Sequence, residues 1–254
     1  MATYKKRGYK PKTKAEKQEV LEDGSTTAEV FKSLDEGASK TEAFIEKNQN
    51  IILGIVGGIA LVVLGYLAYQ EFVQAPKEEE AMNEMFQAQS YFELAMTAQQ
   101  KDSLYGLSLN GGAGKYGFLD IIDNYGGTEA ANLAHYYAGM AYMNTRSYQD
   151  AIDYLDKFNG EDEVLAPLAK GAIGDAFAQL GQMEDALGYY TQAANLRDNN
   201  LTTPRFLLKA GVTAMELGRA GEAVSHFQRI LDEYPNSVET GNARSFKGRA
   251  EAMQ

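Results

Sequence analysis

The hydrophobic pattern of the chain is dominated by one uninterrupted apolar run near the N-terminus. Residues 51–69 read IILGIVGGIALVVLGYLAY, with no charged and no amide side chain. As a helix the run would rise about 28 Å, which matches the hydrocarbon layer of a bilayer. A buried helix of a soluble protein normally shows a polar face, and this run has none. The pattern therefore predicts a single transmembrane helix over residues 49–72.

Glycines inside this run suggest a second role for it. Gly54, Gly58 and Gly65 fall on one face of the predicted helix. Small residues on one face let another membrane helix approach closely. Because glycine is also frequent in membrane helices generally, the spacing favours a packing face without excluding a plain anchor.

The charges on either side of the run predict its orientation. Lys32, Lys40 and Lys47 precede it, whereas Lys77 follows it and is succeeded at once by the acidic residues 78–80. The positive-inside rule then places the N-terminus in the cytoplasm and the C-terminal part outside. A cleaved signal peptide is the rival interpretation, but the leader and the apolar run are both too long for one.

Two segments precede the predicted span. The first 17 residues carry seven basic side chains and one acidic one, so residues 1–25 are predicted to be a disordered basic cytoplasmic tail. This tail is either simply solvated or in contact with anionic lipid or RNA. Residues 26–48 are predicted to form two short amphipathic cytoplasmic helices, broken near Gly37, which serve as a spacer or lie on a membrane or a partner.

The remainder of the chain repeats a short pattern of small and large residues. Three times, a Gly is followed 12 positions later by an Ala and four positions after that by a large apolar residue. The three sets are Gly139–Ala151–Leu155, Gly174–Ala186–Tyr190 and Gly211–Ala223–Phe227. Polar turns at 145–147, 180–182 and 217–219 lie between the Gly and the Ala of each set. The pattern therefore predicts three pairs of closely packed helices.

This spacing resembles the tetratricopeptide repeat, a helix-turn-helix unit of about 34 residues. The resemblance implies an all-α fold, with a tetratricopeptide α-solenoid over residues 73–254 behind the transmembrane helix. Three repeats are clear. A degenerate unit precedes them, made of a helix over 78–99 and the segment 117–125, which mirrors 226–234. A helix over 237–252 is expected to cap the array.

Candidate catalytic features are few, and the sequence predicts a protein that is not an enzyme. The Gly-rich insert 101–115 lacks the first Gly and the hydroxyl residue of a phosphate-binding loop, so a flexible loop is expected there. His135 and His226 belong to different repeats, too few for a metal site. Asp120 and Asp123 are three residues apart and can share a helix face. We interpret them as a solvent-exposed pair and not as catalytic acid–base residues. No catalytic residue, metal or cofactor is therefore expected.

Composition narrows the choice of partner. Residues 70–254 carry 14 basic and 26 acidic side chains, a balance of −12, which argues against binding nucleic acid. The chain has no Cys, which excludes disulfides and thiolate chemistry. A protein partner remains.

In the tetratricopeptide family, five positions of each first helix face the groove of the array. The predicted partner-binding residues obtained from that register are Tyr136, Met140, Met143, Asn144, Asp175, Gln179, Arg205, Leu208 and Met215. The same register includes Leu133, Leu168, Gly171, Ala178, Val212 and Glu216. Methionine adapts to varied apolar partners, so a polypeptide ligand is expected. Alternatively, some of these residues pack against the helix over 78–99.

The basic tail, the membrane-entry segment EKNQNIILGIVGGIALVVLGYLAYQEF and the repeat domain together resemble the YfgM-like family, ancillary subunits of the bacterial SecYEG translocon. The resemblance covers residues 26–254, and the Gly-rich insert departs from it. It implies a single-pass inner-membrane protein with a periplasmic tetratricopeptide domain. The implied partners are SecYEG, a periplasmic membrane-anchored chaperone and membrane lipid, and the implied function is to bind proteins at the translocon exit and assist chaperone handover.

Two other functions stay open at this point. One is a periplasmic adaptor for envelope assembly or cell division. The other is a subunit that presents substrates to a protease complex. Both use the same predicted groove for a different partner, so the sequence alone does not separate them.

Overall fold

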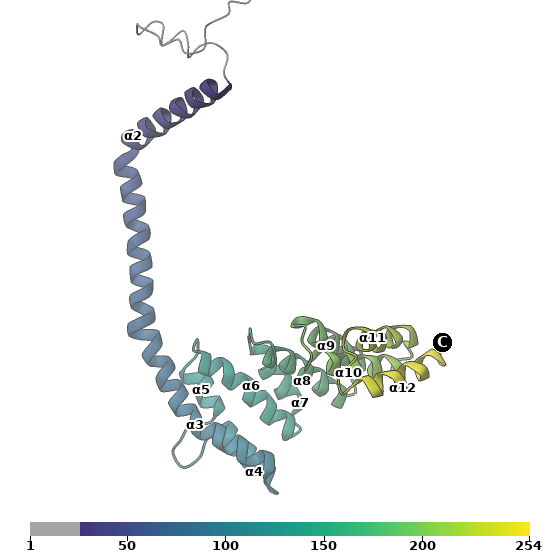
Figure 1. Cartoon of the computed structure of the whole chain (residues 1–254). Helices are drawn as coiled ribbons and strands as arrows, with labels where there is room; N and C mark the ends of the chain where they lie inside the picture. The colour runs from purple at the N-terminus through teal and green to yellow at the C-terminus, as the bar shows by residue number, and fades with distance from the viewer. Residues whose placement is uncertain (1–25) are drawn as a thin grey trace, which may run out of the picture. The chain divides into compact units, whose positions relative to one another are not determined.

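The computed structural model describes residues 26–254, and the predicted disordered tail 1–25 lies outside them. The chain separates into two compact units, Met1–Tyr69 and Gln70–Gln254. The described part is helical throughout, and no β-strand occurs within it (Figure 1). The predicted all-α fold class is therefore confirmed.

The described part of the N-terminal unit is one continuous helix, α2 (Thr26–Tyr69). The predicted break near Gly37 is wrong, because α2 runs through that residue. A single glycine inside a helix costs only about 1 kcal/mol relative to alanine, and the Glu, Ala, Lys and Leu residues around it favour helix. The apolar run lies in α2. Among the described residues, one helical stretch, Phe44–Thr97, holds a window long and apolar enough to cross a membrane, with a mean hydropathy of 2.6.

The C-terminal unit is a succession of short helices in which each helix packs against the next along the chain (Figure 1). It begins with a π-helical turn, η1 (Gln70–Gln74). The α-helices that follow are α3 (Ala75–Thr97), α4 (Lys101–Asn110), α5 (Phe118–Asn124), α6 (Glu129–Asn144), α7 (Tyr148–Lys157), α8 (Leu165–Gln179), α9 (Met183–Leu196), α10 (Thr203–Glu216), α11 (Ala220–Glu233) and α12 (Thr240–Glu251). The core forms three successive clusters, centred on α3–α6, α7–α8 and α9–α12.

The pairs α6–α7, α8–α9 and α10–α11 are each held close at a glycine. A Cβ atom added to that glycine would overlap the large side chain that the second helix presents. These contacts join Gly139 to Leu155, Gly174 to Tyr190 and Gly211 to Phe227. The alanines of the repeated pattern, Ala151, Ala186 and Ala223, are fully buried. The spacing found in the sequence is therefore the interhelical contact of each pair.

The turn inside each pair has the same hydrogen-bonded form. The second residue after the first helix adopts a positive φ: 63° at Arg146, 76° at Gly181 and 74° at Gly218. The next N–H group donates to a carbonyl five residues back, from Ser147 to Tyr142, Gln182 to Phe177 and Arg219 to Ala214, at 2.8–2.9 Å. This is the Schellman motif, which usually places glycine at the left-handed position. Arg146 is the exception among the three.

Replacing Arg146 by glycine is therefore expected to stabilise the C-terminal unit. A left-handed conformation costs a residue with a Cβ atom about 1–2 kcal/mol, part of which glycine loses again through its freedom in the unfolded chain. Arg146→Gly should raise the free energy of unfolding by about 0.5–1 kcal/mol. Urea unfolding of the full chain in mild detergent, followed by circular dichroism, measures this. Arg146→Ala removes the same charge but keeps the strain, so an equal gain from it would contradict the explanation.

The Gly-rich insert is more ordered than the sequence predicts. Its first ten residues form α4, which buries Tyr105 and Leu109 in the first core cluster. The predicted flexible loop over 101–115 is therefore wrong for most of its length. Behind the insert, the segment 118–125 follows the predicted mirror of 227–234: the buried Phe118, Ile121 and Tyr125 match the buried Phe227, Ile230 and Tyr234.

Candidate functional site

The nine predicted groove residues all lie on the first helices of the pairs. Tyr136, Met140, Met143 and Asn144 belong to α6, Asp175 and Gln179 to α8, and Arg205, Leu208 and Met215 to α10. None of the nine is buried: each is partly or fully exposed. Only some of the nine line a pocket, and the others make contacts outside the pockets.

Met143, Asp175 and Gln179 come together in a pocket of about 690 Å³ between α6, α8 and α10. Asp175 forms its polar centre. One carboxylate oxygen of Asp175 accepts hydrogen bonds from the Tyr190 hydroxyl, at 2.6 Å, and from the Lys209 ammonium group, at 2.5 Å. Burial is the main cause that raises the pKa of Tyr190, and the hydrogen bond to Asp175 raises it further. Tyr190 therefore remains a neutral donor, and Asp175 is neutralised by Lys209.

Four other residues of this pocket were not predicted: Arg146, Tyr148, Tyr190 and Lys209. The family register assigns the groove only to fixed positions of the first helices. Arg146 belongs to a turn, while Tyr148 and Tyr190 come from second helices. A signal for Lys209 existed, because it stands 34 residues after Asp175, on the first helix of the next pair.

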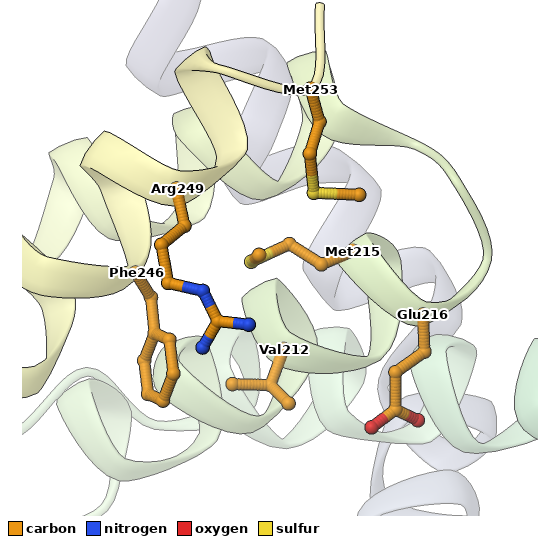
Figure 2. A pocket seen from close by; sticks show the side chains of 6 residues that line it. All are labelled: Val212, Met215, Glu216, Phe246, Arg249 and Met253. Atoms are coloured by element: carbon orange, nitrogen blue, oxygen red, sulfur yellow. The ribbon is translucent and has the colours of Figure 1, made fainter.

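Met215 lies in a second pocket, of about 370 Å³, between α10 and the C-terminal end of α12. Figure 2 shows its lining residues, with the side chains of Met215, Arg249 and Met253 directed into the space between the two helices. The Arg249 guanidinium group lies 5.6 Å from the centre of the Phe246 ring. Val212 and Glu216, also in the predicted register, complete the lining. The pocket combines adaptable apolar side chains with one acid and one base.

A third pocket, of about 580 Å³, lies between the start of α3, α6 and the loop from α7 to α8. It contains Leu133 from the predicted register. The remaining lining residues are Glu78, Met82, Glu129, Asn132, Phe158, Asn159, Gly160, Glu161, Asp162 and Leu165. No pattern in the sequence predicts that the start of α3 lies beside this loop.

The other predicted residues have structural contacts instead. Tyr136 packs its ring 5.4 Å from that of Phe158, and Arg205 stands 5.8 Å over the Phe206 ring. Asn144 donates to a carbonyl of its own helix, Met140 packs against the first core cluster, and Leu208 packs against the third. These residues lie on the same helices but do not line any of the three pockets.

Gly171 is the clearest departure from the predicted register. It was expected to face the groove, but it is buried beneath the ring of Phe206. The reason is that α8 and α10, the first helices of neighbouring pairs, meet at this point. Gly171 therefore serves packing and is not accessible to a partner.

The titratable candidates occupy structural positions. Burial lowers the pKa of His135, as does nearby Lys157, and burial also lowers the pKa of His226. Asp120 accepts from the N–H of Gly117 at 3.0 Å at the start of α5. No group of three or more His, Cys, Asp or Glu side chains able to hold a metal ion occurs in the described part of the chain.

The glycines of the apolar run face open space. Around Gly54, Gly58 and Gly65 no other atom lies within 4 Å of where a Cβ would stand, leaving aside the neighbouring residues of the helix itself. The predicted packing role thus stays a prediction that concerns another chain.

Together these features define an all-helical protein in which an apolar helix precedes an array of helix pairs with pockets on its first helices. A family model described as "T7SS, ESX-1 secretion system protein EccA1, N-terminal domain" matches residues 113–246. The match spans more than half of the chain, from the end of the Gly-rich insert into α12, and the chain belongs to this family. A comparison with curated proteins finds no match.

This family membership corrects the resemblance drawn from the sequence. Assignment to the YfgM-like family is wrong, because the matching family is a different one. The resemblance rested on the order of a basic tail, an apolar run and helical repeats. An order of this kind can be shared by unrelated families, since an anchor and a repeat array are both common building blocks.

Proposed function

We propose that this protein is a non-enzymatic, membrane-anchored adaptor of a protein secretion system, and that its C-terminal unit binds polypeptide partners along α6, α8 and α10. The observation that carries the proposal is the set of pockets on these first helices, which combine partly exposed Met side chains with a few fixed polar groups. Sites for polypeptide side chains have this composition. Family membership supports the link to secretion.

The array itself is proposed to be a tetratricopeptide solenoid, with three repeats, a degenerate first unit and α12 as the cap. Two observations support this assignment. Each pair has a glycine under a large side chain of its second helix, and each has the same Schellman turn. Stacked units of this type present their first helices on one continuous surface.

The anchor is proposed to be α2, crossing a bacterial inner membrane with the N-terminus in the cytoplasm and the C-terminal unit in the periplasm. The lysines before the apolar run and the acids after it support this orientation. Gly54, Gly58 and Gly65 would then offer a packing face to a membrane partner. SecYEG and a periplasmic chaperone are not retained as named partners, because only the YfgM resemblance suggested them.

Site-specific photo-crosslinking in cells tests the proposed binding face. A photoreactive amino acid at Gln179 or Met215 is expected to give crosslinks to polypeptides, identified by mass spectrometry as secretion components or secreted proteins. The same amino acid at Asp153 on α7 or Ser225 on α11, both exposed on second helices, is the control. Equal crosslinking at both sets of positions, or none at the first set, would contradict the proposal. Envelope-assembly or protease subunits as the main products would favour the alternative functions.

A further inference from the structure

The pocket between α3, α6 and the loop from α7 to α8 combines an apolar floor with a rim of acids. Its apolar lining is Met82, Leu133, Phe158 and Leu165. Met82 is about half exposed, at 48%, so the floor is accessible. The acidic lining is Glu78, Glu129, Glu161 and Asp162. The pocket thus brings four apolar and four acidic side chains together.

Two of the acids are fixed by helix ends. The Glu78 carboxylate accepts from the N–H groups of Glu129, at 2.7 Å, and Ala130, at 2.8 Å, and so caps the start of α6. Asp162 accepts from the N–H of Leu165 at 2.7 Å and caps α8. Backbone hydrogen bonds lower the pKa of Asp162. Both carboxylates are therefore held in fixed positions among the lining residues of the pocket.

The loop that forms the far wall is also fixed. Asn132 donates to the carbonyl of Asn159 at 2.9 Å and accepts from its N–H at 2.9 Å. Further along the loop, the carbonyl of Glu163 accepts a hydrogen bond at 2.9 Å from Asn199, which lies between α9 and α10. These bonds hold Phe158 in place against Tyr136. The pocket is therefore preformed, which lowers the entropy lost on binding.

The negative charge of this pocket has no cation to balance it. Its lining contains no Lys or Arg, and none of its four acids forms an ion pair among the described residues. The adjacent base in the chain, Lys77, donates to the carbonyl of Gly126. In contrast, the pocket around Asp175 contains Lys209, and the pocket around Glu216 contains Arg249. Of the three pockets, this one selects for a positive partner.

We propose that this pocket receives a large aliphatic side chain of a polypeptide segment that carries Lys or Arg on either side of it. The choice of a polypeptide rests on the proposed function, whereas the choice of basic and aliphatic residues rests on the pocket. Anionic lipid and nucleic acid are repelled by the same four carboxylates. A free metal ion would leave the apolar floor unfilled.

Fluorescence anisotropy tests the proposal with the full chain in nanodiscs of zwitterionic lipid. The probe is a fluorescein-labelled peptide, Lys-Lys-Leu-Lys-Lys within a Gly-Ser background. It is expected to bind, and its affinity should fall as salt is raised. Analogues with Ser in place of Leu, or Glu in place of Lys, should bind about tenfold more weakly or worse. Empty nanodiscs are the blank. Absence of binding, or equal binding of the Glu analogue, would overturn the proposal.

Variants locate the binding. Glu129→Gln with Glu161→Gln should weaken binding about threefold to tenfold and flatten its salt dependence. Met82→Gln should weaken it about tenfold. Because Met82 is about half exposed, the variant is expected to fold, which circular dichroism verifies. Asp185→Asn with Glu239→Gln removes two charges outside the lining of this pocket, and this control should leave binding unchanged.

A further control separates this inference from the proposed function. Met215→Gln alters only the pocket between α10 and α12. If Met215→Gln weakens peptide binding and the variants of the acidic pocket do not, the inference is wrong while polypeptide binding stands. If no peptide binds and the positions on α8 and α10 give no crosslinks in cells, the proposed function itself fails.

Discussion

Phe118→Ala is expected to lower the free energy of unfolding of the C-terminal unit by about 3–5 kcal/mol, the range for truncating a fully buried phenylalanine. Phe118 has no exposed surface. Its ring stacks on Tyr137 at 5.2 Å and meets Phe92 edge-on at 6.2 Å, so it joins α3, α5 and α6. A helix of seven residues such as α5 depends on these contacts, since an isolated helix of that length is unstable.

Phe86→Ala is the matched control on α3, because Phe86 is 68% exposed and the same atoms are removed. It should change the free energy of unfolding by no more than about 0.5 kcal/mol. The chain has no Trp, so urea unfolding in mild detergent is followed by tyrosine fluorescence and circular dichroism. Equal losses in the two variants would mean that α5 is not anchored as the structure describes.

The helix pairs could be predicted because their contacts are short in sequence. Gly211 and Phe227 are 16 residues apart, on two helices joined by a short turn. When a small residue contacts a large one across a short turn, the two lie at a fixed distance in the sequence. Because the same distance occurs three times in this chain, the pattern could be recognised. The same holds for the left-handed glycines Gly181 and Gly218, which a helix end requires locally.

The helix α4 was missed because its glycines outweighed its apolar spacing. Tyr105 and Leu109 are four residues apart and both buried, as on one face of a helix. Gly106 lies inside this helix with open space around it, so it only weakens the helix slightly. The glycines that do end the helix start at Gly111, whose φ is 77°. The helical spacing was therefore the more informative signal.

Contacts between different helix pairs were the hardest to predict. Met143, Asp175 and Gln179 of the predicted register line one pocket in the structure. It did not show that Lys209 neutralises Asp175, because that contact joins different helix pairs. The acidic pocket depends on still more distant contacts, such as Glu78 capping α6 from 51 residues away. No local pattern encodes these pairings, since they arise only when the units stack.

Gly171→Ala is expected to destabilise the C-terminal unit by about 2–3 kcal/mol. The sequence predicted that Gly171 faces the groove, whereas the structure buries it between helix pairs. An added Cβ would overlap the ring of Phe206. That ring is only 2% exposed and is packed into the third core cluster, so it has little room to rotate away. The methyl group must therefore separate α8 from α10 or displace the ring.

Gly188→Ala on α9 is the matched control, because Gly188 is exposed and has no atom within 4 Å of an added Cβ. Alanine is the better helix former, so this variant should gain up to about 1 kcal/mol. Opposite signs for the two substitutions in urea unfolding would show that the loss at Gly171 is steric. Phe206→Leu, which shortens the side chain, should cost less in the Gly171→Ala background than in the original chain, because both changes act on one contact. Additive losses would instead mean that Gly171 and Phe206 do not hold α8 and α10 together.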